Sequence, residues 1–228
     1  MKNDYWVNFW QDYTTDITEK DEQSQVLRTF NKKPITEELW QFTLDEIDSV
    51  FNVVEGDHVL DLCSGNGLLS KHFLTKGASV AAVDISKELL TNLEGIEGID
   101  AIHSDIRAVD FDNHTFDHIL FYAGIQYLTD KEAIVLLQKI YNWLKPGGSL
   151  FIGDIPDVKK RWNFFNNEER HKVFFDNQLK GEAIVGNWFE SDWFDNLTAY
   201  LGFKEGQLVE QDEKLIYSTF RFDYLYKK

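Results

Sequence analysis

The chain has 228 residues, is 43% hydrophobic and 27% charged, and carries a formal net charge of −16. This length suffices for one domain with a sizeable core, and the apolar content excludes general disorder. Because so acidic a chain repels phosphate groups unless it has a concentrated basic patch, DNA, bulk RNA and anionic membrane surfaces are not expected as partners. Nothing in the sequence indicates the oligomeric state.

The cysteine content and the hydropathy of the sequence exclude further classes of protein. Cys63 is the only cysteine, which excludes an intrachain disulfide and a thiolate-based structural zinc site. The first residues lack the apolar core of a secretory signal, and no apolar stretch approaches the roughly 20 residues that cross a bilayer. We therefore expect a cytoplasmic protein.

Residues 1–55 are mixed polar and aromatic and predict a helical N-terminal cap. A helix is expected near residues 36–51, because apolar side chains from Ile35 to Phe51 recur at steps of three and four. Its apolar stripe predicts a helix packed against the rest of the domain.

From residue 56 to 154, short apolar strands alternate with helices. One helix is expected from about Leu68 until Gly77 stops it, another after Ser86, and a third after the capping box that Thr129 opens. This alternation predicts a parallel sheet covered by helices on both faces. The strands are expected at residues 58–62, 79–84, 99–103, 117–122 and 149–153.

The last part of the chain changes character. Residues 155–195 hold nine Trp or Phe residues among charges, and they predict a small second core or a lid over the strand ends. Residues 203–209 and 215–226 read as an antiparallel hairpin. The expected fold class is therefore α/β: a doubly wound, mostly parallel seven-stranded sheet with a C-terminal antiparallel β-hairpin.

Carboxylates end three successive strands of this expected sheet, where a doubly wound fold binds its ligand. Asp84 lies 19 residues beyond Gly65, the spacing at which an acid reaches ribose hydroxyls. Asp61 precedes the glycine turn, where it would repel the pyrophosphate of NAD but attract an ammonium or a sulfonium. The strand ends thus favour S-adenosylmethionine over NAD. Asp61 as a turn cap and Asp105 as an ordinary turn residue are the alternatives.

Five segments in this order resemble the motifs of class I S-adenosylmethionine-dependent methyltransferases of the small-molecule type. The resemblance covers roughly residues 56–154 and implies a methyltransferase domain over 56–228, with 155–195 as a lid or acceptor insertion. The segments are Val59–Gly67, Ala82–Ser86, His103–Ile106, Phe116–Leu120 and Leu144–Gly148.

The resemblance also implies residue roles. The turn Gly65–Gly67 would pack against the amino-acid portion of the cofactor, with Asp61 on its ammonium side. Asp84 would bind the ribose, and the adenine would meet its remaining contacts further along the strand ends. Those expected contacts are Ile85, Asp105 and Ile106, while Phe121 and Tyr122 would line the methyl-transfer end.

Three further residues complete the expected cofactor site. Asn66 lies within the glycine turn, and Cys63 stands where many family members have glycine, so that a small side chain is kept. Arg28 is a cation in an acidic segment, and we expect it to contact the cofactor's carboxylate or an anionic acceptor. The alternative for Arg28 is a solvated helix charge.

Methyl transfer is an in-line displacement, so the protein must mainly align the two reactants and exclude water. A base is needed only for a poor nucleophile, and the candidates are His171, Asp154 and Tyr122. No metal is expected, because Tyr122 begins the segment where a magnesium-dependent enzyme would have its first ligand.

The acceptor is expected to be a small molecule methylated on O or N. Residues 28–35 and 153–157 resemble members associated with surface-sugar gene sets, so a sugar or sugar nucleotide is among the candidates. We also expect Tyr5, Trp6, Trp10 and Tyr13 to close the cavity opposite the lid. The alternatives are a protein or RNA methyltransferase, or a protein of this fold that binds S-adenosylmethionine without methylation.

Overall fold

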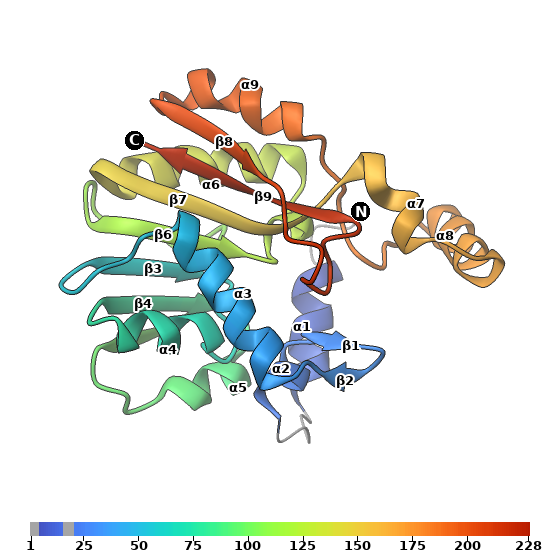
Figure 1. Ribbon diagram of the computed structural model, residues 1–228, viewed down its shortest axis with the longest axis horizontal. Helices are drawn as coiled ribbons and strands as arrows, with labels where there is room; N and C mark the ends of the chain where they lie inside the picture. The colour runs from blue at the N-terminus through green and yellow to red at the C-terminus, as the bar shows by residue number, and fades with distance from the viewer. Residues whose placement is uncertain (1–4, 16–20) are drawn as a thin grey trace.

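The computed structural model describes residues 5–15 and 21–228. Its centre is a seven-stranded sheet in the order β5-β4-β3-β6-β7-β9-β8 (Figure 1). The strands β3 to β7 are parallel, and β9 runs antiparallel between β7 and β8. The predicted fold class is confirmed. The strands are β3 (His58–Leu62), β4 (Ser79–Asp84), β5 (Ile99–His103), β6 (Phe116–Tyr122), β7 (Leu144–Pro156), β8 (Glu205–Val209) and β9 (Arg221–Lys227).

Helices cover both faces of the sheet, because the central strands are apolar on both sides. The helices α3 (Glu37–Val50) and α4 (Leu68–Thr75) pack on one face, where Trp40, Leu44 and Phe73 join the core. The helices α6 (Asp130–Trp143) and α9 (Ser191–Leu201) pack on the other, where Leu137 and Phe194 are fully buried. Short helices α5 (Lys87–Leu90) and η1 (Thr91–Leu93) follow β4. None of the helices in the described residues is long and apolar enough to span a bilayer.

The local signals in the sequence produce the predicted helix starts. Ser86 accepts a hydrogen bond from the Leu89 amide and so caps α5. Thr129 and Glu132 form the reciprocal capping box at the start of α6. Both signals act over three residues, which is why the sequence alone was sufficient to find them.

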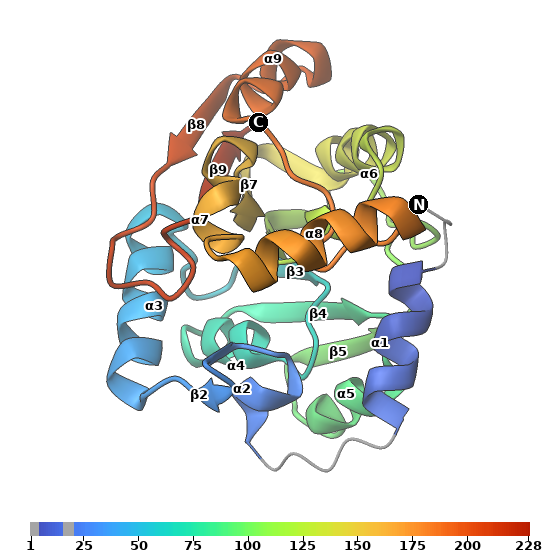
Figure 2. The same cartoon turned by 90° about the vertical axis from the view of Figure 1, so that its right-hand side faces the viewer.

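The N-terminal segment forms small elements beside the sheet. They are α1 (Tyr5–Thr15), α2 (Glu22–Gln25), β1 (Thr29–Phe30) and β2 (Lys33–Pro34), and the two strands pair as a hairpin. Figure 2 shows α1 beside α5, on the side of the molecule where the parallel strands end.

A second group of elements projects from the body of the protein (Figure 1). It comprises η3 (Val158–Lys160), α7 (Arg161–Phe164) and α8 (Glu168–Lys180), and no residue of α8 is buried. Trp162, Phe165 and Phe174 pack against one another here, with ring centroids 4.8 to 6.5 Å apart. The aromatic residues of this segment therefore do form a small cluster of their own.

Two strands, β7 and β9, begin five or more residues from the predicted position. β7 starts at Leu144 instead of residue 149, because the chain regains pairing with Phe116 immediately after α6. The segment 215–220 forms turns, so β9 begins at Arg221. The Tyr217 hydroxyl there donates to the carbonyls of Leu27 and Thr29, so this loop meets the N-terminal segment instead of extending the sheet.

Candidate active site

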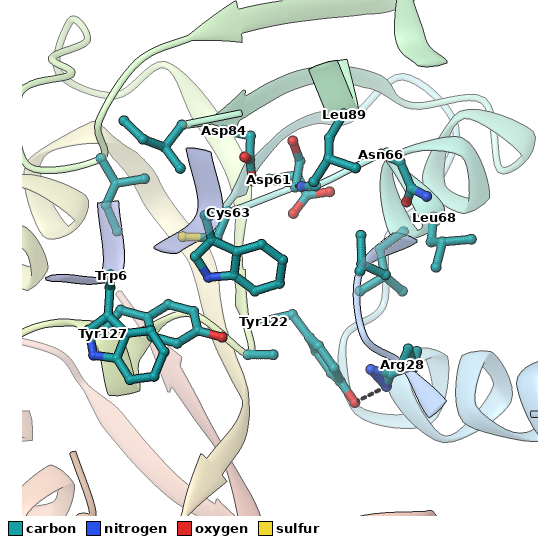
Figure 3. Close-up of a pocket in the computed structure, with 18 of the residues that line it drawn as sticks. Trp6, Arg28, Asp61, Cys63, Asn66, Leu68, Asp84, Leu89, Tyr122 and Tyr127 are labelled. Carbon is teal, nitrogen blue, oxygen red and sulfur yellow. Dashed lines mark hydrogen bonds between the residues drawn. The ribbon is translucent and has the colours of Figure 1, made fainter. Parts of the chain in front are cut away.

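The main pocket lies beyond the carboxyl ends of β3, β4 and β6 and has an empty volume of about 1150 Å³, counted with its solvent-open part. Figure 3 shows Asp61 and Asp84 on one side of it, and the pairs Trp6–Tyr127 and Arg28–Tyr122 on the other. The expected residues in its lining are Arg28, Asp61, Cys63, Gly65, Asn66, Asp84, Ile85, Asp105, Ile106 and Tyr122.

The glycine turn after β3 is shaped by backbone conformation and by close packing. Gly65 and Gly67 have φ angles of +58° and +78°, which favour glycine. A Cβ on Gly65 would lie 2.7 Å from a methyl of Val26, and one on Gly67 would lie 2.2 Å from Leu93. Gly65 lines the pocket, whereas Gly67 does not: it packs against Leu93 and begins α4.

Asp61 is a buried carboxylate at the end of β3. The Ser70 hydroxyl donates to it over 2.6 Å. Burial raises the pKa of Asp61 to about 7, an effect that the hydrogen bond from Ser70 only partly offsets and the nearby Asp84 carboxylate reinforces. A cationic group in the pocket would stabilise the ionised form of this carboxylate.

Asp84 joins the glycine turn after β3 to the start of α5. Its two oxygens accept hydrogen bonds from the amides of Gly65 and Ser86, each over 2.8 Å. Burial raises its pKa although both hydrogen bonds oppose this. Each oxygen retains a second lone pair that could accept from a ligand hydroxyl.

Asp105 is fixed by an arginine that the sequence analysis missed. Arg107 donates to both Asp105 oxygens and also pairs with Glu132. Burial acts to raise the pKa of Asp105, but the Arg107 hydrogen bonds hold it below the ordinary value. In the sequence, the position of Arg107 two residues after Asp105 was the signal that could have indicated this ion pair.

Arg28 is buried, with 10% of its side chain exposed, so it is not a solvated helix charge. Its Nη2 donates to the Tyr122 hydroxyl over 2.8 Å, and its Nη1 lies 3.3 Å from an Asp154 oxygen. The guanidinium carbon is 4.8 Å from the centre of the Tyr122 ring and 5.3 Å from that of Trp40. Trp40, another lining residue that the sequence analysis missed, thus helps to hold Arg28.

Aromatic side chains of α1 form the opposite wall. Trp6 and Trp10 line the pocket, and the Trp6 ring lies 4.8 Å from Tyr127 of η2 (Ile125–Tyr127). Tyr5 and Tyr13, which were expected beside them, belong to the outer side of α1. Because α1 has aromatic residues on two faces, the sequence alone could not show which of these faces lies toward the pocket.

Besides Gly67, three expected site residues lie outside the pocket lining. Phe121 is fully buried in the core, because it and Tyr122 are neighbours in a strand and point to opposite faces. Asp154 is buried behind Arg28. His171 is exposed on α8, with its ring 5.7 Å from that of Trp162. No residue of 155–195 belongs to the described lining.

Several polar atoms in the lining are buried without a hydrogen-bond partner among the described residues. They are the Trp6 Nε1, the Arg28 Nε, the Ser64 Oγ and the Asn66 Oδ1, and all four residues line the pocket. Buried polar groups are seldom left unpaired in folded proteins.

Comparison with known proteins identifies the central part of the chain. Residues 59–148 match the family described as "Methyltransferase domain". A protein of Xanthomonas oryzae named ubiquinone/menaquinone biosynthesis C-methyltransferase UbiE is 30% identical over 120 residues, 48% of this chain and 47% of that protein. The Escherichia coli O1:K1 protein of the same name is 32% identical over 125 residues. The chain thus matches about half the length of these relatives.

Solved structures resemble the whole fold. Phosphoethanolamine N-methyltransferase 1 of Haemonchus contortus, solved with phosphoethanolamine and S-adenosylhomocysteine, matches with a TM-score of 0.71 and 15% identity over 99% of this chain and 48% of that one. An S-adenosylmethionine-dependent methyltransferase of Archaeoglobus fulgidus matches with a TM-score of 0.60 and 16% identity, over 85% and 95% of the two chains. The motifs, the sheet topology and the family match agree: residues 59–148 are similar to a methyltransferase domain, and the fold is that of S-adenosylmethionine-dependent methyltransferases of known structure.

Proposed function

We propose that this chain transfers a methyl group from S-adenosylmethionine to a small-molecule acceptor. The observation that carries this proposal is the pocket beyond the strand ends, whose lining holds the carboxylates Asp61, Asp84 and Asp105 together with the buried Arg28. Such a lining complements a ligand that has a carboxylate, an ammonium and a sulfonium. It would repel the pyrophosphate of a dinucleotide.

Each lining residue binds a different part of the cofactor. Asp84 accepts hydrogen bonds from the ribose, and Asp105 accepts one from the adenine amine between the apolar side chains of Ile85 and Ile106. Asp61 neutralises the positive charge near the glycine turn, and Arg28 meets the carboxylate. When bound, S-adenosylmethionine supplies an electrophilic methyl group.

The rest of the lining points to a ring-bearing acceptor. Trp6, Trp10 and Tyr127 offer aromatic faces that stack on a sugar or a conjugated ring, and they exclude water from the reacting atoms. The two arginines of the described lining already have roles: Arg28 meets the cofactor carboxylate, and Arg107 is paired with Asp105 and Glu132. We therefore favour an acceptor without a phosphate at this wall.

The acceptor atom should be nucleophilic without a strong base from the protein. Burial raises the pKa of Tyr122 well above its ordinary value, so its hydroxyl stays protonated and does not serve as a base. His171 lies outside the lining, and Asp154 is paired with Arg28. An amine nitrogen, or a ring position that ionises by itself, fits this site better than an unactivated sugar hydroxyl.

The relatives named for ubiquinone and menaquinone biosynthesis support a second acceptor class, a quinol ring methylated on carbon. Its ring would stack on the same aromatic wall. An amino sugar and a quinol are thus the two acceptor classes to compare first.

Calorimetry and a labelled-methyl assay test the proposal. The purified protein should bind S-adenosylmethionine and S-adenosylhomocysteine but not NAD, and it should transfer label to an amino sugar or a quinol from a small-molecule panel. Binding of NAD, together with no binding of either sulfur nucleoside, would overturn the proposal. Binding without transfer to any acceptor, RNA and protein included, would instead favour a cofactor-binding protein without methylation activity.

A further inference from the structure

Two segments that are far apart in the sequence meet at one end of the pocket. Arg28 belongs to the N-terminal segment, and Asp154 belongs to β7, 126 residues later. The Asp154 oxygen lies 3.3 Å from Arg28 Nη1, and both side chains are buried. Two charges removed from water in this way require close partners, so the pair deserves a specific explanation.

A bulge in β7 puts Asp154 in this place. Pairing between β7 and β9 is regular up to Ile152, shifts register, and resumes at Ile155. Within the shift, Asp154 has a φ of +57°, which a non-glycine residue adopts only when its surroundings enforce it. Its amide donates to Asp223 over 2.7 Å, and its carbonyl accepts from Arg221 over 2.6 Å. Bulges of this kind commonly redirect a side chain next to a functional site.

Among the described residues, the hydrogen bonds of the Asp154 carboxylate connect it to the pocket lining through Arg28. One oxygen faces Arg28, the other accepts from the Gln211 side chain over 2.8 Å, and the residue does not line the pocket. Arg28 in turn lines the pocket and donates to the Tyr122 hydroxyl, as Figure 3 shows. Arg28 therefore connects Asp154 in the bulge with Tyr122 in the pocket wall.

We propose that Asp154 is a positioning residue that fixes the Arg28 guanidinium, and with it the Tyr122 hydroxyl, in the orientation that receives the anionic end of the cofactor. This inference rests on the proposed function. Without the carboxylate, the buried guanidinium loses its charged partner and gains freedom to turn toward solvent. The alternative is an ion pair that merely attaches the N-terminal segment to the sheet.

A double-mutant cycle separates the two roles. Calorimetry with S-adenosylhomocysteine is carried out on the wild-type protein, Asp154→Asn, Arg28→Met and the double variant, and each melting temperature is recorded. We expect Arg28→Met and Asp154→Asn each to weaken binding by about tenfold or more. The double variant should bind no more weakly than Arg28→Met alone, because Asp154 acts only through Arg28. The control is Asp117→Asn, which breaks an ion pair with Lys145 at the start of β6. It should leave binding unchanged.

Each outcome decides the question. Wild-type affinity in a folded Asp154→Asn protein, or independent losses that add in the double variant, would overturn the positioning role and leave the proposed function intact. If the wild-type protein itself does not bind S-adenosylhomocysteine, the proposed function fails and the inference with it. If Asp154→Asn does not fold, Gln211→Leu replaces it, since this change removes one of the contacts that hold the carboxylate. Its smaller loss of affinity should also vanish in the Arg28→Met background, and a loss that persists there would overturn the inference.

Discussion

Ser86 donates a 2.8 Å hydrogen bond to the hydroxyl of Thr14, and both side chains are completely buried. The Thr14 hydroxyl also donates a hydrogen bond to the Trp10 carbonyl, four residues earlier in α1. Ser86 caps α5 directly after β4. A hydroxyl pair between two elements thus seats the N-terminal helix on the strand end that carries Asp84.

Binding of S-adenosylhomocysteine should slow hydrogen exchange in α1 and in the segment 21–28, because both border the pocket. Exchange in α8 should change little, since none of its residues lines the pocket. Hydrogen-exchange mass spectrometry with and without the ligand measures both. Strong protection of α8 would instead support the lid that the sequence predicts for residues 155–195.

Removing the Thr14 hydroxyl should loosen α1. We expect Thr14→Val, which keeps the shape of the side chain, to weaken S-adenosylhomocysteine binding by roughly 1–2 kcal/mol, because Ser86 loses a buried partner. The matched control is Thr15→Val. This neighbour is exposed, and its hydroxyl donates within the helix, to the Gln11 carbonyl. Equal affinities of the two variants would contradict the seating of α1 through Thr14.

Ligand affinity should depend on pH through Asp61. Burial raises the pKa of this carboxyl to about 7, and an ammonium group favours its ionised form, so affinity should rise with pH and level off above about 7. Below that, it should fall by up to about tenfold per pH unit. Asp61→Asn should flatten the profile. Asp223, whose pKa burial also raises to about 7, does not line the pocket, so Asp223→Asn is the control that should retain the dependence.

The same carboxyl should reduce the stability of the unliganded protein at high pH. A pKa that is higher in the folded than in the unfolded chain makes folding less favourable as pH rises from about 4 to 7. Asp61→Asn should therefore raise the melting temperature at pH 8 relative to the wild-type protein, and the gain should disappear near pH 4. A gain of equal size at both pH values would assign the effect to packing.

Asp84 should matter for both binding and local order. Asp84→Ala removes an acceptor for ribose hydroxyls, and we expect a loss of about 1.5–3 kcal/mol in S-adenosylhomocysteine affinity. It also frees the amides of Gly65 and Ser86, so their exchange should accelerate in the unliganded variant. Asp100→Ala, on the exposed side of β5, controls for the loss of a charge. Unchanged affinity in a folded Asp84→Ala protein would remove this residue from the site.

Local and periodic signals in the sequence predicted the sheet, the helix caps at Ser86 and Thr129, and the acids at the strand ends. Each depends on residues close together in the chain or on the repeat of a strand. The partnership of Arg28 with Asp154 depends on contacts across 126 residues and on a bulge, so spacing could not show it. His171 was misplaced for the related reason that the direction in which α8 projects is set by tertiary packing. Phe121 is different: strand alternation with Tyr122 was visible in the sequence and would have placed it in the core.

The attachment of α1 to the end of β4 affects the expected rate of catalytic turnover. The helix contributes Trp6 and Trp10 to the pocket wall and is joined to the strand end through a buried hydroxyl pair. We expect a spent cofactor to leave this site as the helix shifts, so that product departure, not bond making, sets the turnover rate. Turnover would then slow with solvent viscosity and hardly respond to deuterium in the transferred methyl group.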